Sequence, residues 1–200
     1  MAHPELTVAI LAGGAASRLS GRDKGLEPLG AKPMIEWVIG YCEQHVGANA
    51  ELLIIANRNI DAYARYARVR TDETTGFQGP LAGVASALDA ASAPRVLTLP
   101  VDCPNPPSDL AARLGVAMET SNTSAAVAHD GERRQPLFAL YRRELAVAAA
   151  AGAGAGQGVW EWQDAIGAVE VDFADRRQQF HNLNTSDEFA AYADALRSRD

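Results

Sequence analysis

The chain has 200 residues, of which 48% are hydrophobic and 22% are charged, a balance that excludes an intrinsically disordered or collagen-like protein. Its formal net charge of −7 argues against a general nucleic-acid binder, because such a protein needs a basic surface to neutralise phosphates. The length fits one ordinary globular domain over residues 1–200, in which any anionic ligand must be held by a local site.

Apolar runs rich in β-branched residues alternate along the chain with segments of helical period. This alternation predicts an α/β fold, with a largely parallel sheet covered by helices on both faces. Several of the runs are continuously apolar, as expected for strands buried on both sides. The predicted strands are 6–11, 52–56, 95–101, 124–128, 136–141 and 168–172.

Prolines and serines mark the starts of the predicted helices. Pro33 and Pro80 suit the first helical turn, because a proline there loses no needed hydrogen bond. Ser108 and Ser186 are expected to cap the two later helices, since their hydroxyls can accept from free backbone N–H groups. The predicted helices run over residues 33–45, 80–91, 109–120 and 187–197.

The Ala/Gly-rich stretch 148–158 is the one low-complexity segment of the sequence. Its alternating glycines remove backbone restraint, so we predict a flexible loop here instead of a helix end. A strand and a helix are predicted after it, which places this loop inside the domain.

Glycines and cations concentrate where the first predicted strand passes into a loop, at residues 11–25. Gly13 and Gly14 allow the backbone to approach a ligand and turn N–H groups toward a phosphate, while Arg18 and Lys24 supply cations around the same anion. The spacing fits neither a Walker loop nor a dinucleotide-binding fingerprint. Because lysine occurs only here and at Lys32, a nucleotide triphosphate loop is favoured over a glycine turn with solvated cations.

Segments spread in order over nearly the whole chain carry a family resemblance. They read LAGG, SRLSGRDKGL, GAKPMIEWV, IANRNIDAY, TDETTGFQGPLAGVASAL, LPVDCP and FHNLNTSDEF. Together they resemble the molybdenum cofactor guanylyltransferases, the MobA family of nucleotidyltransferases. The resemblance implies a three-layer, Rossmann-like fold with a mostly parallel mixed sheet. It also implies transfer of GMP from GTP to the terminal phosphate of molybdenum-bound molybdopterin, with release of pyrophosphate.

The same resemblance implies a GTP site. Lys24 would stabilise negative charge on the α-phosphate, and Arg18 would hold the phosphates that leave as pyrophosphate. Asp102 ends an apolar strand, where α/β sheets place their ligands, and its carboxylate suits Mg²⁺, which prefers oxygen ligands. Arg18, Lys24 and Asp102 are therefore the implied catalytic residues. The implied GTP contacts are Leu11, Ala12, Gly13, Gly14, Lys24, Asn57, Asp72, Gly79 and Asp102.

Taken alone, some of these residues also have a structural interpretation. Asp72, next to a glutamate, fits a solvated turn, and Asn57 fits the cap of a helix beginning near residue 59. Gly79 fits a tight connecting turn. A lone carboxylate at the mouth of a buried strand needs a partner to offset its desolvation, which makes Asp102 the strongest acidic candidate.

Asn182 and Asn184 alternate on a predicted extended stretch and are expected to face the same way. By resemblance they contact molybdopterin or assist the metal, whereas otherwise they satisfy loop backbone before the last helix. Many family members carry arginines in the loop that here reads GAGAGQG. Because this chain lacks them, the sequence does not decide which residues bind the second substrate.

Other functions compete with this one. A cytidylyltransferase acting on the same cofactor shares the loop and the metal, although the LAGG form and the GPLAG segment favour guanine. A non-catalytic nucleotide-binding regulator with the same fold would not need the catalytic residues, and a dinucleotide-binding oxidoreductase would need a different glycine fingerprint. The expected cofactor is Mg²⁺. The expected partners are GTP and Mo-molybdopterin, with cofactor-delivery or molybdoenzyme chaperone proteins as further candidates.

The cysteines and the first residues indicate the compartment. Cys42 and Cys103 are too few for a disulfide framework and are not spaced as a Cys-x-x-Cys metal site, which favours a reducing environment. The apolar run near the N-terminus lacks a basic lead and is interrupted well short of the roughly 20 residues of a membrane span. We therefore expect a cytoplasmic protein without a membrane partner.

Overall fold

The computed structural model describes residues 4–13, 23–47, 49–71 and 79–197. Three of the predicted site residues, Gly14, Arg18 and Asp72, lie outside these ranges. Within the described residues, no helix is both long and apolar enough to cross a membrane.

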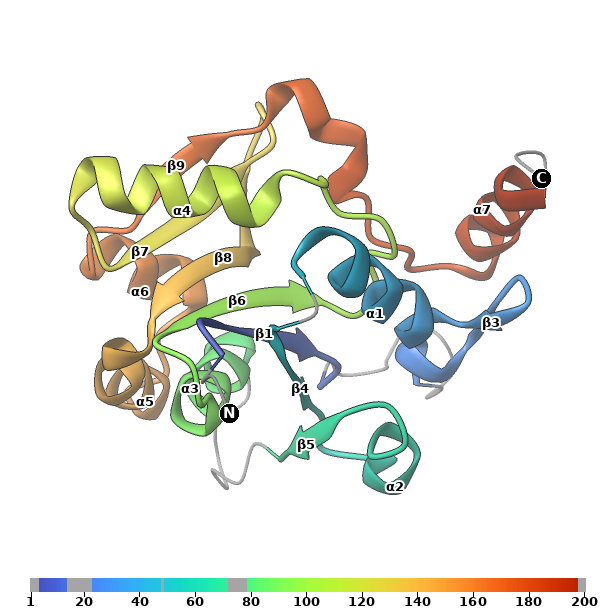
Figure 1. Cartoon of the computed structure of the whole chain (residues 1–200), viewed down its shortest axis with the longest axis horizontal. Helices are drawn as coiled ribbons and strands as arrows, with labels where there is room; N and C mark the ends of the chain where they lie inside the picture. The colour runs from blue at the N-terminus through green and yellow to red at the C-terminus, as the bar shows by residue number, and fades with distance from the viewer. Residues whose placement is uncertain (1–3, 14–22, 48, 72–78, 198–200) are drawn as a thin grey trace.

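A seven-stranded sheet runs through the described part of the chain in the order β5-β4-β1-β6-β8-β7-β9 (Figure 1). Only β8 runs antiparallel to its neighbours within it. The strands are β1 (Leu6–Leu11), β4 (Glu51–Ile55), β5 (Arg68–Arg70), β6 (Arg95–Pro100), β7 (Ala125–His129), β8 (Arg134–Arg142) and β9 (Val169–Asp172). This mostly parallel, mixed sheet confirms the predicted fold class.

Helices cover both faces of the sheet, giving three layers (Figure 1). Helices α1 and α4 pack in one hydrophobic core, and α3, α5 and α6 pack in the other. These helices are α1 (Met34–His45), α3 (Pro80–Ala90), α4 (Leu110–Ser121), α5 (Ala146–Gly154) and α6 (Val159–Ala165). The short α2 (Ile60–Tyr63) follows β4, and the 3₁₀ turns are η1 (Lys24–Leu26), η2 (Arg143–Leu145) and η3 (Ala174–Phe180).

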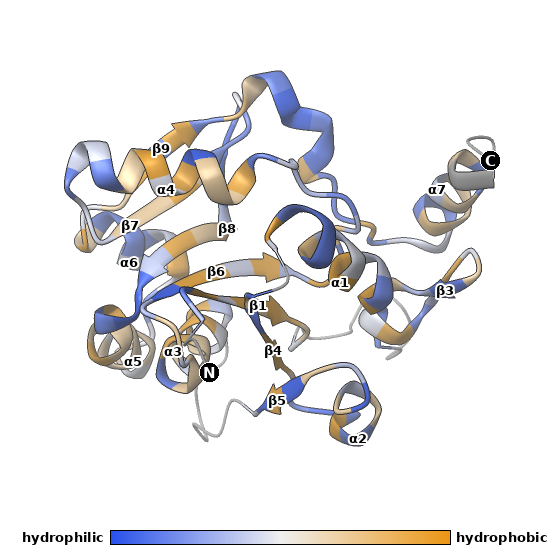
Figure 2. Cartoon of the chain, viewed as in Figure 1, coloured by the Kyte–Doolittle hydropathy of each residue, from blue (hydrophilic) through white to orange (hydrophobic). Residues whose placement is uncertain are grey.

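Strand β1 shows why its sequence is apolar without interruption. Val8 and Ile10 belong to the core under α1 and α4, whereas Ala9 belongs to the core under α3, and all three side chains are fully buried. Successive strand side chains point to opposite faces, so a strand covered on both sides needs apolar residues at every position. Figure 2 shows the central strands β1 and β4 as hydrophobic.

A smaller unit lies beside the sheet and joins a hairpin from the first part of the chain to the last described helix. The hairpin of β2 (Pro28–Leu29) and β3 (Lys32–Pro33) packs against α7 (Ser186–Arg197). The apolar side chains between them are Leu29, Met34, Leu183 and Phe189. This contact brings the last helix next to the segment that follows the glycine-rich loop.

The predicted loop over 148–158 is wrong in its first half, because α5 continues to Gly154. A Cβ at Gly152 would lie 2.9 Å from Cδ1 of Trp162 and 3.3 Å from Cδ2 of Leu81 in α3. The small residues thus allow α5 to approach α3 and α6 closely. The packing gained by this approach outweighs the backbone entropy that glycine loses in a helix.

The predicted helix starts agree with the structure to within about one residue, but both predicted serine caps are wrong. Asp109 occupies the cap position of α4 and makes no side-chain cap bond. At α7 the cap is Thr185, whose Oγ1 accepts from the N–H of Glu188 at 3.2 Å, while the Glu188 carboxylate accepts from the N–H of Thr185 at 2.8 Å. This reciprocal pair is a capping box.

Candidate active site

The carboxyl ends of β4, β1 and β6 lie next to one another at one edge of the sheet. Leu11 is in register with Ile55 on one side and with Pro100 on the other. The ladder extends one step further, since the N–H of Ala12 donates to Ile55 O at 2.8 Å. Ligands of open α/β sheets bind beyond this edge. The predicted residues Ala12, Gly13, Asn57 and Asp102 follow these three strand ends.

Gly13 and Asn57 meet across the gap between β1 and β4. A Cβ at Gly13 would lie 3.7 Å from Nδ2 of Asn57, so the glycine leaves the amide side chain room beside the backbone. Asn57 does not cap α2; that position belongs to Asn59, which adopts a left-handed backbone with φ of 51°. The interpretation of Asn57 as a helix cap is therefore wrong.

Helix α3 begins at the same edge. Gly79 is its cap residue, and Pro80 is its first residue, as the sequence predicts for the proline. One turn later, a Cβ at Gly83 would lie 3.6 Å from Cδ2 of Leu11. The first turn of α3, which carries the positive end of the helix dipole, therefore lies near the end of β1.

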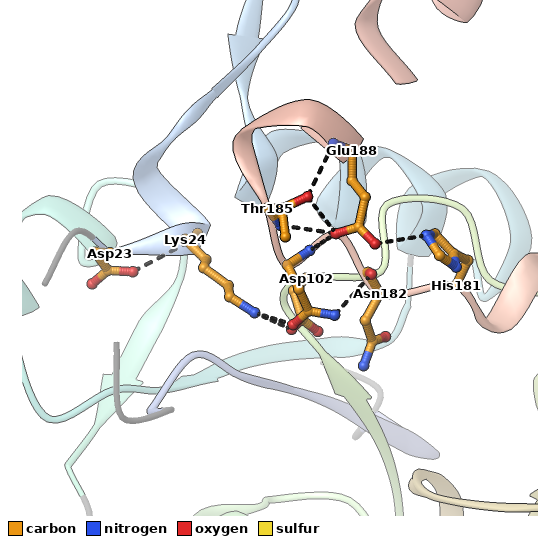
Figure 3. Close-up of polar contacts among 9 residues, drawn as sticks. Asp23, Lys24, Asp102, His181, Asn182, Thr185 and Glu188 are labelled. Carbon is orange, nitrogen blue, oxygen red and sulfur yellow. Dashed lines mark hydrogen bonds and ion pairs between the residues drawn. The ribbon is translucent and has the colours of Figure 1, made fainter. Parts of the chain in front are cut away.

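The ammonium of Lys24 contacts two of the predicted site residues (Figure 3). Its ammonium donates to Oδ2 of Asp102 at 3.0 Å and to Oδ1 of Asn184 at 2.6 Å. The side chains of Lys24 and Asp102 are 22% and 17% exposed, so the ion pair is shielded and still accessible to a ligand. The structure thus brings together a cation, a carboxylate and an amide that are far apart in the sequence.

The segment after η3 is held at the end of β6. The N–H of Leu183 donates to the backbone oxygen of Asp102 at 2.8 Å. Asn184 Nδ2 donates to the backbone oxygen of Asn182 at 3.0 Å, and the carboxylate of Glu188 accepts from the Asn184 N–H at 2.7 Å. Of the two asparagines predicted to face the same way, only Asn184 contacts Lys24 through its side chain.

The donor set at this edge fits a magnesium ion. A carboxylate offers about four lone-pair sites, so the contact with Lys24 leaves Asp102 capacity for a metal. The Oδ1 atom of Asn182 is buried and has no hydrogen-bond partner within the described residues. No group of three or more His, Cys, Asp or Glu residues able to hold a metal occurs in the described chain. A single carboxylate such as that of Asp102 is compatible with Mg²⁺, which takes one or two protein carboxylates and completes its shell with substrate phosphates and water.

The sequence analysis did not identify two acidic residues of this region. Asp23 caps η1 and lies immediately before Lys24, but its other partners come from α2 and the turn before it, so no local pattern indicates it. Glu188 could have been found from the Thr-x-x-Glu spacing of a capping box at Thr185. The N–H groups of Asn184 and Thr185 hold the pKa of the Glu188 carboxyl below its ordinary value.

The chain is similar to known proteins in both sequence and structure. A protein from Shewanella amazonensis, described as a molybdenum cofactor guanylyltransferase, is 40% identical over 189 residues, which cover 94% of this chain and 95% of that protein. The crystal structure of molybdopterin-guanine dinucleotide biosynthesis protein A from Archaeoglobus fulgidus superposes with a TM-score of 0.77 at 22% identity, covering 96% of this chain and 99% of that one.

A Mycobacterium tuberculosis protein crystallised in complex with manganese shares the fold, with a TM-score of 0.65 and 14% identity over 96% of this chain and 100% of that one. The chain is a nucleotidyltransferase, an enzyme that transfers a nucleotidyl group from a nucleoside triphosphate. The family model of the MobA-like NTP transferase domain matches residues 8–169, and the chain belongs to this family.

Proposed function

We propose that the chain transfers GMP from GTP to the terminal phosphate of Mo-molybdopterin, forming the guanine dinucleotide of the cofactor and pyrophosphate. The observation that carries this proposal is the contact of the Lys24 ammonium with Asp102 and Asn184 at the carboxyl edge of the sheet. The activity is the one for which the Shewanella amazonensis relative is named. GTP and molybdopterin are therefore its substrates.

In this reaction the protein positions two anions and neutralises their charge. A terminal phosphate oxygen attacks the α-phosphorus of GTP in line, the bond to the bridging oxygen breaks, and pyrophosphate leaves. A phosphate monoester is largely ionised near neutral pH, so no general base and no covalent enzyme intermediate are required. Lys24 is placed to stabilise the negative charge that develops on the α-phosphate. Mg²⁺ bound at Asp102 would supply further charge neutralisation on the phosphates.

The other residues divide between the two substrates. Main-chain groups of Leu11, Ala12 and Gly13, together with Asn57 and Gly79, line the strand ends and the start of α3, where GTP would bind. Gly14, Asp72 and the pyrophosphate-binding Arg18 belong to this set by family resemblance. Asn182 and Asn184 lie in the segment after η3, which Leu183 bonds to the backbone of Asp102, and are proposed to contact molybdopterin.

Isothermal titration with GTP, CTP and ATP in the presence of Mg²⁺ tests this proposal. We expect selective binding of GTP that weakens about tenfold in Lys24→Ala, because one charge-assisted contact to phosphate is lost. Lys32→Ala is the matched control, since Lys32 lies over the Trp37 ring and donates to Glu36 O on the β2–β3 side. Preference for CTP would indicate a cytidylyltransferase, and the absence of nucleotide binding would refute the proposal.

Confirmation of GTP binding justifies the complete assay with Mo-molybdopterin. Pyrophosphate released only when GTP and the acceptor are both present establishes transfer. Binding of GTP without release of pyrophosphate would indicate a regulator that kept the fold.

A further inference from the structure

Asp23 is a buried carboxylate directly before Lys24 in the chain. Its side chain is 5% exposed. Oδ1 accepts from the N–H of Gly25 at 3.2 Å and from the hydroxyl of Tyr63 at 2.5 Å. Oδ2 accepts from Nδ2 of Asn59 at 3.0 Å and lies 3.5 Å from Nε of Arg58. Both oxygens are therefore occupied by groups from η1, α2 and the turn before α2.

The turn that carries Lys24 cannot be stable by itself. Element η1 is only three residues long, and short 3₁₀ turns make poor hydrogen bonds. The lysine side chain has four rotatable carbons and loses about 2 kcal/mol of rotamer entropy when it is fixed. The contacts of the ammonium with Asp102 and Asn184 therefore need a second set of contacts that holds the backbone of this turn in place.

The contacts around Gly25 link this turn to α2 and to the residue that follows β6. A Cβ at Gly25 would collide with the hydroxyl of Tyr63 and would lie 2.9 Å from Cγ2 of Val101. Val101 is the residue directly before Asp102, the partner of Lys24. The absence of a side chain at Gly25 thus sets the spacing between the backbone of Lys24 and the end of β6.

The Tyr63 hydroxyl donates a hydrogen bond to the Asp23 carboxylate. Tyr63 is fully buried. Burial, together with the hydrogen bond to Asp23, raises the pKa of the phenol above its ordinary value, so the group stays protonated over the whole working pH range. A buried carboxylate is stabilised only when its lone pairs are matched by such donors.

We propose that Tyr63 and Asp23 form a positioning pair, which holds the η1 turn so that the Lys24 ammonium stays directed at Asp102 and Asn184. Neither residue touches the reacting atoms; both act through Lys24. The catalytic consequence rests on the proposed function, whereas the effect on the lysine itself does not. The pair makes α2, a helix outside the predicted nucleotide contacts, a determinant of turnover.

The first experiment observes Lys24 directly. The chain has only two lysines, so protein labelled with ¹³C-lysine gives one set of side-chain signals for Lys24 and one for Lys32. In the wild type we expect a restrained Lys24 with non-equivalent ε protons, and in Tyr63→Phe an averaged signal, with the Lys32 signals unchanged. An unchanged Lys24 signal in Tyr63→Phe overturns the proposal. This readout needs neither substrate nor activity.

The second experiment measures turnover in a double-mutant cycle. We expect Tyr63→Phe to lower kcat/KM for GTP about ten- to a hundredfold, because a displaced Lys24 no longer holds the phosphates in the bound nucleotide or in the transition state. In the Lys24→Ala background the same substitution should have no further effect, because its target is gone. A full effect of Tyr63→Phe in that background would show a general structural role and overturn the proposal. Absence of transfer in the wild type would refute the proposed function alone.

Matched variants separate positioning from folding. Tyr66→Phe removes a phenol hydroxyl that donates to Glu36 at 3.2 Å, a contact outside the Asp23 network, and should leave both readouts unchanged. If Tyr63→Phe does not fold, Asn59→Gly removes the donor to the other oxygen of Asp23 and suits the left-handed backbone at that position. It should shift the Lys24 signal in the same direction, and no shift in this folded variant would overturn the proposal.

Discussion

The ammonium of Lys24 donates to Oδ1 of Asn184 at 2.6 Å, and these two residues are 160 positions apart in the sequence. Lys24 follows the first strand, and Asn184 directly precedes the cap of the last helix. The contact closes the site between the two ends of the described chain. The proposed site is therefore complete only when the C-terminal segment has packed against the β2–β3 hairpin.

Replacement of the Asp102 carboxylate tests its role as a metal ligand. Asp102→Asn keeps an acceptor for Lys24 and removes the negative charge, so we expect kcat to fall on the order of 100-fold while the fold is retained. Turnover should be measured against Mg²⁺ concentration with both substrates saturating. Asp109→Asn serves as the control, because it makes the same replacement of a carboxylate by an amide at the cap of α4. Wild-type turnover and metal dependence in Asp102→Asn would contradict a metal at this position.

The close packing at Gly25 predicts a stability effect. Gly25→Ala places a methyl group against Tyr63 and Val101, and overpacking of this kind costs typically about 1–3 kcal/mol. Gly158→Ala is the comparison, because a Cβ there meets nothing within 4 Å and the change should cost less than about 1 kcal/mol. Urea denaturation of the three proteins measures the difference. Equal stability of both variants would show that the η1 turn moves aside at no cost.

The lowered pKa of Glu188 predicts a pH dependence of stability. Hydrogen bonds from the N–H groups of Asn184 and Thr185 favour the charged carboxylate in the folded state. Because the folded pKa lies below the unfolded one, this stabilisation is present above the unfolded pKa and is lost as the pH falls through the folded pKa.

Glu188→Gln should therefore be less stable than the wild type at about pH 7, and this difference should shrink on acidification below about pH 4. Urea midpoints at several pH values measure it. Asp187→Asn, one position earlier on the exposed side of the same turn, controls for general charge effects. A difference that stays constant with pH would argue against the hydrogen bonds of Glu188 as its source.

The two thiols are expected to be unreactive in the folded protein. Burial raises the pKa of both Cys42 and Cys103 to about 12, which leaves a thiolate fraction on the order of 10⁻⁴ at about pH 8. Iodoacetamide labelling followed by mass spectrometry should modify neither residue under native conditions and both in concentrated urea. Rapid native labelling of Cys103 would show that the loop after Asp102 opens.

Periodicity and local chemistry predicted much of this fold. The apolar runs located β1, β4, β6, β7, β8 and β9, and the prolines located the starts of α1 and α3, because both signals depend only on neighbouring residues. The three-residue β5 and the two-residue β2 and β3 were missed, since segments so short carry no readable period, whereas a helix near residue 59 was anticipated where α2 begins. The serine caps failed because a neighbouring Asp or Thr took each cap position.

The sequence by itself determined which residue types stand at the carboxyl edge of the sheet as candidates for a nucleotide site: Gly13 after β1, the lysine at position 24, and an aspartate at the end of β6. Only the tertiary structure decided that Lys24 pairs with Asp102 and Asn184, that Tyr63 anchors the turn through Asp23, and that an Ala/Gly stretch forms a helix. These outcomes depend on contacts between segments far apart in the chain. Such contacts leave no periodic trace in the sequence, because their free energy comes from packing and burial that exist only once the sheet has formed.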